Sequence, residues 1–299
     1  MTPTRILPAA LWMVGALLSF STMAVSIREL AGRLTIFEVL AVRSGVALLI
    51  IIGVGLARVH LLRGLSLRRL GLQFMRNAVH YVAQYAWATS LTLLPLATVF
   101  ALEFTMPAWT ALLAAGFLGE RLTLSRVGVV VLGFIGVLVI VRPGLDSVRP
   151  GIVLILAAAF GFAVTMVATK ELTKTESTFA IVFWMNLLQL PMAFLGSDPN
   201  FFAKIDAGMT VPIIGIGVAG LSSHFCLSNA FRVGEAIVVV PFDFMRIPLI
   251  AVVGWWLYGE PLDALVFLGA GLIIAGVLWN LRAESRSLRV VPSVDAVRG

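Results

Sequence analysis

Ten long apolar runs follow one another along the chain of 299 residues, and they limit its fold more than any other feature. A helix needs about 20 mostly apolar residues to cross the hydrocarbon core of a bilayer. Outer-membrane strands would instead show alternating segments of about ten residues. The pattern therefore predicts an all-α polytopic membrane protein with ten transmembrane helices. The predicted helices are 8–27, 36–57, 71–93, 96–118, 126–141, 151–169, 178–195, 209–230, 236–258 and 263–281.

The composition agrees with a chain whose outer surface faces lipid. Apolar residues make up 60% of the sequence and charged residues only 12%, whereas a soluble domain has about a quarter of its residues charged. The net charge of +7 comes mostly from Lys and Arg in the short gaps between the runs. That distribution is typical of membrane orientation, so we expect a lipid bilayer as partner and no nucleic acid.

The basic gaps also predict how the chain is oriented. Most Lys and Arg residues would lie on one side of the membrane, which is then the cytoplasmic side. Both termini are expected in the cytoplasm of a bacterial-type inner membrane. The first run, after Arg5, is interpreted as a retained helix and not as a signal peptide. The polar, basic segment 284–299 is expected to be a disordered cytoplasmic tail.

The two halves of the chain resemble each other. Glu103 recurs as Asp243 and Glu120 recurs as Glu260, both at an offset of 140 residues. Because each half holds five helices, an odd number, the second half must enter the membrane from the opposite side. Inverted repeats of this kind are typical of transporters that work by alternating access around a central cavity. The predicted repeats are 1–144 and 145–283.

The matched positions also resemble a known family. They are Pro107, Gly119-Glu120-Arg121-Leu122, Gly128, Gly133 and Gly136 in the first half, and Pro248, Gly259-Glu260-Pro261-Leu262, Gly269 and Gly276 in the second. With these residues the chain resembles the EamA-type members of the drug/metabolite transporter superfamily, which contain two copies of a five-helix unit. The resemblance implies transport of amino acids, related metabolites or lipophilic cations, often outward. Within the group the chain is similar to aromatic amino-acid exporters of the YddG type. One departure is Arg246, where the first half has Met106, so the halves cannot contribute equally to a site.

The third predicted helix carries a stripe of polar and aromatic residues. The stripe consists of Arg76, His80, Gln84 and Trp87, flanked by Tyr81 and Tyr85. Their helical spacing places them near one face, and such a face is costly in lipid, so we expect it to line the central cavity. Aromatic faces can bind an apolar group or a cation, and His80 and Gln84 can bind amino or carboxylate groups. The alternative is that these residues tie helices together. For Arg76 we expect snorkelling towards the membrane surface or pairing with an acid.

Other candidate residues lie on four further helices. The additional cavity candidates are Met106, Trp109, Trp184, His224 and Ser228. Glu103 and Asp243 are candidates for proton coupling or for recognition of an ammonium group, although Arg246 can neutralise Asp243 one turn away. The hinge candidates are Pro107, Pro241 and Pro248, because proline frees backbone groups within a membrane helix.

These features predict a secondary transporter and not an enzyme. The sequence contains no Walker A motif, no HExxH and no GxSxG, and no cofactor or metal site is expected. We expect an exporter of aromatic or hydrophobic, methionine-like amino acids or of related small metabolites. A multidrug or lipophilic-cation exporter remains the alternative, and an intramembrane enzyme or a channel is disfavoured. The glycine faces of the fifth and tenth helices are expected to act as a scaffold or as a homodimer surface.

Overall fold

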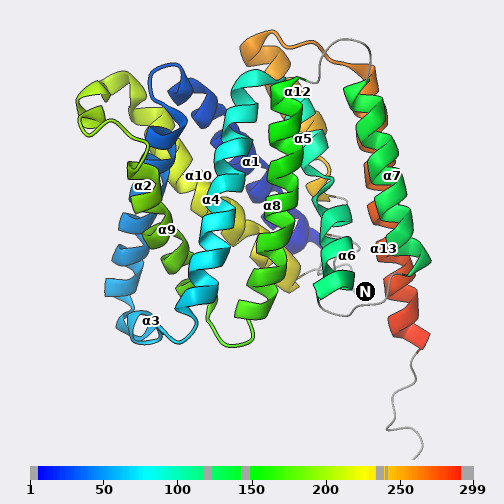
Figure 1. Ribbon diagram of the computed structural model, residues 1–299, viewed down its shortest axis with the longest axis horizontal. Helices are drawn as coiled ribbons and strands as arrows, with labels where there is room; N and C mark the ends of the chain where they lie inside the picture. Colours follow the sequence, from blue (N-terminus) through cyan, green and yellow to red (C-terminus); the bar gives the residue numbers. More distant parts are fainter. Residues whose placement is uncertain (1–5, 118–122, 143–148, 234–238, 240–241, 291–299) are drawn as a thin grey trace, which may run out of the picture.

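The computed structural model describes residues 6–117, 123–142, 149–233, 239 and 242–290. Within these residues every regular element is a helix, and the long helices stand side by side in one bundle (Figure 1). The α-helices are α1 (Ile6–Ala31), α2 (Ile36–Ala57), α3 (Val59–Arg63), α4 (Leu70–Leu93), α5 (Leu96–Glu103), α6 (Met106–Phe117), α7 (Leu124–Val141), α8 (Pro150–Leu172), α9 (Thr178–Phe194), α10 (Thr210–Val233), α12 (Arg246–Tyr258) and α13 (Ala264–Val290). Two short 3-10 helices, η2 (Phe201–Lys204) and η3 (Ala207–Met209), precede α10.

Seven segments of the described chain are both long and apolar enough to cross a membrane. Two further apolar helices, α9 and α12, are shorter than this limit. The helix α4 is long, but its buried face is rich in polar side chains. The helical content and the positions of the helices agree with the prediction from the sequence. The full count of ten membrane helices stays a prediction.

The long helices pack in pairs. α1 lies along α10, α4 along α8, α2 along α9, and α7 along α13. In Figure 1 the α2–α9 pair stands at one end of the bundle and the α7–α13 pair at the other. The largest hydrophobic core draws on α1, α2, α4, α5 and α8, with Ile27, Leu40, Leu91, Phe100 and Ile155 among its fully buried members.

The predicted span 96–118 consists of two helices, and its part Leu96–Leu113 is apolar enough to cross a membrane. The helix α5 ends at Glu103, a turn follows at Phe104-Thr105, and α6 begins at Met106. Pro107 explains this break, because its ring removes an N–H donor and clashes with the carbonyl of the fourth residue before it. The described part of the predicted helix 236–258 is interrupted in the same way, since a turn at Phe244-Met245 precedes α12.

The predicted tail is also shorter than expected. The helix α13 runs to Val290, so the part of 284–299 up to that residue is helical and not disordered. Arg and Leu, which are good helix formers, recur in this part as Arg286, Leu288 and Arg289, and this lets the helix continue past its membrane-spanning part. Residues 291–299 lie outside the described part of the chain.

The glycine faces of α7 and α13 pack against each other within one chain. A Cβ added at Gly136 would lie 2.6 Å from the carbonyl oxygen of Gly269, and one added at Gly276 would lie 3.3 Å from that of Gly128. These small residues therefore allow the two backbones to approach closely. The glycine faces therefore act as a scaffold within one chain. They no longer support the expectation that they form a homodimer surface.

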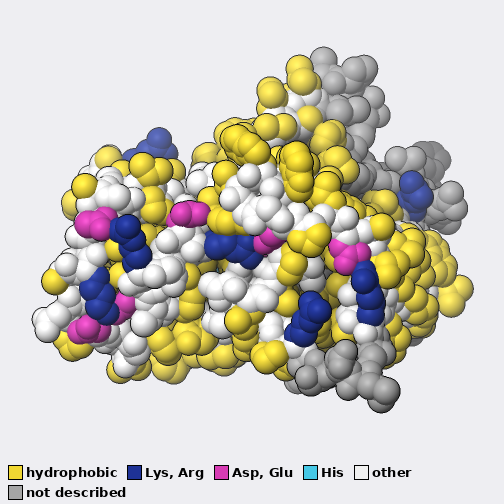
Figure 2. Space-filling model, turned by 90° about the horizontal axis from the view of Figure 1, so that it is seen from above, with side chains coloured by type: hydrophobic (Ala, Val, Ile, Leu, Met, Phe, Trp, Pro, Cys, Tyr) yellow, Lys and Arg dark blue, Asp and Glu magenta, His cyan; other side chains and the backbone are white. Residues whose placement is uncertain are grey.

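Ion pairs gather at the end of the bundle that holds the α1–α2, α9–α10 and α12–α13 connections. Figure 2, which views the molecule from above, shows basic and acidic atoms next to each other among hydrophobic ones. Arg33 pairs with Asp206 at 2.5 Å, and Arg142 pairs with Asp263. Arg28 pairs with Glu260 and also donates to the backbone oxygens of Leu91 and Leu94, which ties α1 to the α4–α5 link.

Candidate functional site

The polar stripe of α4 faces the inside of the bundle. Arg76, His80, Gln84 and Trp87 are each less than a tenth exposed, whereas Val82 on the opposite face is 67% exposed. α4 packs against α8 and α9 on its inner sides. The helical spacing seen in the sequence thus places these side chains between helices and away from lipid.

Hydrogen bonds connect this stripe to three neighbouring helices. Arg43 Nη1 of α2 donates to Gln84 Oε1 at 2.9 Å, and both side chains are buried. Gln189 Nε2 of α9 lies 2.9 Å from His80 Nδ1. Arg76 Nε donates to Thr169 Oγ1 of α8 at 3.1 Å. The stripe therefore forms the centre of a buried polar cluster.

The structure corrects the expectation for Arg76. Its side chain is buried and donates to Asn77 Oδ1 at 2.7 Å as well as to Thr169. No carboxylate in the described part of the chain lies within ion-pair distance of it. Arg76 therefore neither snorkels to the surface nor pairs with a described acid.

Arg43 and Gln189 are members of this cluster that the choice of site residues from sequence missed. Arg43 is one of three arginines in the interior of the predicted helices, and a charge within an otherwise apolar run was the available signal. Gln189 and the nearby buried Asn186 are uncharged, so only their position in the run 178–195 could have pointed to them.

A second cluster joins the two helix breaks. Arg246 Nη2 lies 2.6 Å from Asp243 Oδ1, and Arg246 Nη1 lies 3.3 Å from Glu103 Oε1. Trp87 Nε1 donates to the other oxygen of Glu103 at 2.7 Å. The two matched acids thus share one arginine, and the stripe of α4 reaches this cluster through Trp87.

Aromatic rings surround the guanidinium of Arg246. Its Cζ lies 3.9 Å from the centre of the Phe20 ring and 5.2 Å from that of Phe104. Ring faces attract a cation, and the attraction is stronger where water is excluded. Phe20 also meets the ring of His224 edge-on, with centroids 6.1 Å apart, so it joins this cluster to α10.

A cavity of about 440 Å³ lies between α2, α9 and α10. Its walls include His224 and Ser228, which are exposed within it, and the ring of Phe179. Most of the other lining residues are apolar, and Ile50 and Phe225 among them lie on the outer surface. The cavity therefore opens sideways between helices.

The remaining predicted aromatic residues occupy different places. Tyr85 packs against the Phe37 ring with centroids 4.6 Å apart, and Tyr81 lies 6.4 Å from the same ring. Trp109 meets Phe160 edge-on at 5.5 Å, which places it at the α6–α8 contact. Trp184 is half-buried, and its indole N–H has no partner among the described residues.

The hinge candidates lie at the starts of helices. Met106 and Pro107 open α6, and Pro248 is in the first turn of α12. Pro241 lies outside the described residues. Over the part of the chain that the structure covers, no group of three or more His, Cys, Asp or Glu side chains could hold a metal ion.

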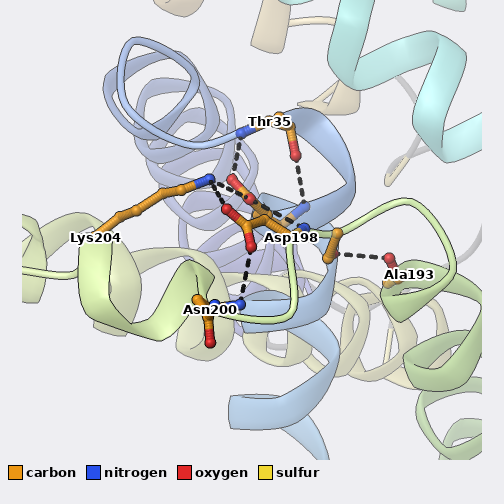
Figure 3. A network of polar contacts seen from close by, with 7 residues as sticks. Thr35, Ala193, Asp198, Asn200 and Lys204 are labelled. Carbon is orange, nitrogen blue, oxygen red and sulfur yellow. Dashed lines mark hydrogen bonds and ion pairs between the residues drawn. The ribbon is translucent and has the colours of Figure 1, made fainter.

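A polar network fastens the α9–α10 connection to the start of α2 (Figure 3). The fully buried Glu38 accepts hydrogen bonds from Lys204 Nζ and from the Thr35 backbone N–H, each at 2.8 Å. Lys204 also pairs with Asp198 at 3.2 Å. The N–H of Asn200 and then Lys204 lower the pKa of Asp198, and the bond to Glu38 raises the pKa of Lys204.

The sequence model of the EamA-like transporter family matches residues 7–142 and again residues 149–282. The chain belongs to the EamA-like transporter family. The resemblance to the drug/metabolite transporter superfamily is therefore confirmed, and this EamA-like protein is a multi-pass membrane transporter of small molecules, not an enzyme. The narrower resemblance to aromatic amino-acid exporters receives no support from the comparisons.

Several curated relatives of this EamA-like protein are transporters. A riboflavin transporter of Rhizobium johnstonii is 28% identical, covering 96% of this chain and 95% of the relative. An S-adenosylmethionine uptake transporter of Rickettsia felis is 24% identical over 93% of both chains. A pseudopaline exporter of Pseudomonas aeruginosa is 27% identical, covering 87% and 91%. The relatives thus differ in substrate and direction.

The fold also occurs among solved structures. One crystal structure, 18% identical in sequence, aligns with a TM-score of 0.61 and covers 95% of this chain and 98% of its own. The likeness extends over nearly the whole of both chains, so the helical architecture described above is shared.

Proposed function

We propose that this protein is a secondary carrier that exports aromatic or hydrophobic amino acids, or related small metabolites, by alternating access. The observation that carries the proposal is the meeting of two discontinuous helices. The breaks after Glu103 and Asp243 lie at matched positions, and Arg246 contacts both acids. Discontinuous helices that meet inside the membrane are where many transporters bind their substrates.

The helix contacts support ten membrane helices arranged as two inverted repeats, 1–144 and 145–283, around a central cavity. The contact of α1 with α10 has its counterpart in the contact of α8 with α4. α2 packs against α9, α5 against α12 and α7 against α13, and in each pair the partners occupy the same place in the two halves. The family match to each half in turn also supports this arrangement.

The orientation follows from the same proposal. Five helices per repeat place the N-terminus and the C-terminus on one side, and the excess of Lys and Arg assigns that side to the cytoplasm of an inner membrane. In this orientation the α9–α10 connection, with its Glu38 and Lys204 network, faces outward.

The substrate class rests on the chemistry of the α4 cluster. The rings of Tyr85 and Phe37 offer an aromatic surface, and His80 and Gln84 offer hydrogen-bonding groups. Two relatives are named for riboflavin and S-adenosylmethionine, which combine an aromatic ring system with polar groups. An aromatic amino acid is a small metabolite with both features.

Uptake into proteoliposomes of the purified protein tests this proposal. Labelled phenylalanine, methionine, riboflavin and tetraphenylphosphonium are compared in wild type, His80→Ala, Tyr85→Ala and, as a control, Val82→Ala. We expect saturable phenylalanine or methionine uptake that falls at least tenfold in the two site variants and is unchanged in Val82→Ala, since Val82 faces outward. Transport of tetraphenylphosphonium alone would replace the amino-acid proposal by the lipophilic-cation alternative. Absence of uptake of every solute by folded protein would contradict both.

A further inference from the structure

We propose that Arg43 and Arg76 form a binding site for an oxyanion, so that the transported solute carries a carboxylate or phosphate group. The inference deepens the proposed transport function and rests on it for the meaning of the site. The site lies on the inner face of α4, where Arg43 of α2 contacts Gln84 and Arg76 contacts Thr169 of α8.

Both arginines are buried in helices that belong to the membrane-spanning bundle. Arg43 is 3% exposed and Arg76 is 8% exposed. An uncompensated charge in such a place costs several kcal/mol. Their described hydrogen-bond partners are all neutral, namely Gln84 for Arg43, and Asn77 and Thr169 for Arg76. No described carboxylate lies within 4.0 Å of either guanidinium.

A third buried arginine of the described chain has acids beside its charge, although its Nε also has no described partner. Arg246, which is 5% exposed, has Asp243 and Glu103 beside it and the Phe20 ring above it. An arginine that serves only to join helices can thus be neutralised in this fold. The pair Arg43 and Arg76 instead leaves two positive charges inside the described bundle, and these favour an anion from outside the protein.

Further buried polar groups on the same two helices have no described partner. Arg43 Nε and the Ser44 hydroxyl on α2 are buried and have no described partner. On α4, Gln73 Nε2, Asn77 Nδ2 and the Tyr81 hydroxyl are likewise buried and unpaired. These three α4 residues follow a spacing of four, so they share a face of the helix next to Arg76. Gln73 Oε1 on α4 and the side-chain oxygens of Asn186 and Gln189 on α9 are buried acceptors without a described partner. Buried polar groups in proteins normally find a partner, so the set indicates a polar ligand, and the two arginine charges favour an anionic one.

An oxyanion is the ligand that the two arginines fit. The planar fork of a guanidinium binds a carboxylate or a phosphate through two parallel hydrogen bonds, and such charge-assisted bonds are the strong ones. Asn77, whose side chain lies beside Arg76, can donate to a remaining lone pair. The ring of Phe37, which packs on Tyr85 and lies 6.4 Å from Tyr81, provides an apolar surface beside them for the rest of the solute.

Thermal unfolding of the purified full chain in detergent tests the inference without any need for transport. The probes are two pairs that differ in the anionic group alone, phenylalanine against phenylalanine amide and riboflavin 5′-phosphate against riboflavin, with inorganic phosphate as a fifth probe. We expect an anionic probe to raise the unfolding temperature and its uncharged or cationic counterpart to leave it unchanged. A shift by inorganic phosphate as large as that by riboflavin 5′-phosphate would assign the site to free phosphate, and a shift by the metabolite alone would assign it to an anionic metabolite.

Three substitutions connect this selectivity to the proposed site. Arg43→Gln and Arg76→Gln are expected to weaken anion binding about 10- to 100-fold, the usual effect of losing a hydrogen bond to a charged group. Arg68→Gln is the control, because Arg68 is exposed between α3 and α4, and it should bind as wild type does. If a glutamine variant does not fold, Arg43→Lys and Arg76→Lys, which keep the charge but lose the fork, should still weaken binding.

The outcomes separate this inference from the transport proposal. Three results would overturn the oxyanion site. The charged and uncharged probes of a pair could bind equally, no anionic probe could bind, or the Arg43 and Arg76 variants could keep the anion preference of the wild type. If the wild type transports no solute, the transport proposal is contradicted, whereas a measured preference for anions still supports the oxyanion site.

Discussion

Arg246 and Glu103 face each other across the two helix breaks, with Nη1 of the arginine 3.3 Å from Oε1 of the glutamate. Each belongs to a different half of the chain. Because Arg246 also holds Asp243 at 2.6 Å, one cation fixes the meeting point of both discontinuous helices.

Removing this cation should destabilise the protein strongly. In Arg246→Gln the two carboxylates lose their shared partner, and breaking a buried pair in this way costs about 3–5 kcal/mol. We expect a marked fall of the unfolding temperature in detergent and partial recovery in Arg246→Gln/Asp243→Asn, where one of the two negative charges is gone. An unfolding temperature equal to that of wild type would show that the cluster does not hold the breaks together.

The indole of Trp87 should contribute a smaller and separable part. Trp87→Phe keeps a ring but leaves one oxygen of Glu103 without its donor, and an unmet hydrogen bond costs about 1–3 kcal/mol. The matched control is Trp255→Phe, because Trp255 is 56% exposed in α12. Unfolding temperatures should therefore fall in Trp87→Phe and change little in Trp255→Phe, and an equal effect of both would point to ring size as the cause.

The close packing of α7 and α13 predicts that substitutions of two of their glycines, Gly136 and Gly271, have different effects on stability. A methyl group at Gly136 would meet the backbone oxygen of Gly269 at 2.6 Å, whereas one at Gly271 meets nothing within 4 Å. Gly136→Ala should cost about 1–3 kcal/mol through overpacking, and Gly271→Ala should be neutral or slightly stabilising. Thermal unfolding of the two variants checks this contrast, and equal stability would contradict the described contact.

The network of Figure 3 predicts a pH dependence with a defined sign. The pKa of Asp198 is lowered, so its pairing contributes stability above the ordinary carboxylate pKa and loses it as pH falls through the lower folded value. The pKa of Lys204 is raised, so its contribution is full below about pH 10.4, the ordinary lysine value, and disappears as pH rises through the folded value.

The measurement is the difference in unfolding temperature between wild type and Lys204→Met across pH. The difference should be largest and constant between about pH 5 and pH 9 and should shrink in strong acid and strong base. Arg33→Met is the control, since the Arg33–Asp206 pair is more than half exposed and surface pairs contribute little. A difference that grows in acid would contradict the assigned sign.

Most of the fold could be predicted because the membrane imposes a simple pattern. The run 36–57 coincides with α2, and the run 71–93 is within one residue of α4. The broken helices could not be placed by hydropathy, since α5 and α6 form one apolar run. Pro107 was the visible signal, but proline is tolerated in many membrane helices that stay continuous.

The candidate site was predictable only in part. Helical spacing correctly places His80, Gln84 and Trp87 on one buried face. The partners from other helices, Arg43 and Gln189, depend on which helices meet in space, and one sequence alone does not determine that. The contact of Trp87 with Glu103 crosses from α4 to α5 and likewise requires the three-dimensional arrangement.

The most direct test of the central claim is counterflow in proteoliposomes of the purified chain. Vesicles loaded with unlabelled phenylalanine and diluted into a trace of labelled phenylalanine should show transient accumulation above equilibrium, because a carrier must return its site across the membrane. The account predicts this overshoot in wild type and in Val82→Ala and its loss in His80→Ala. Phenylalanine flux that only equilibrates, with no stimulation by solute on the other side, would contradict alternating access and indicate a channel.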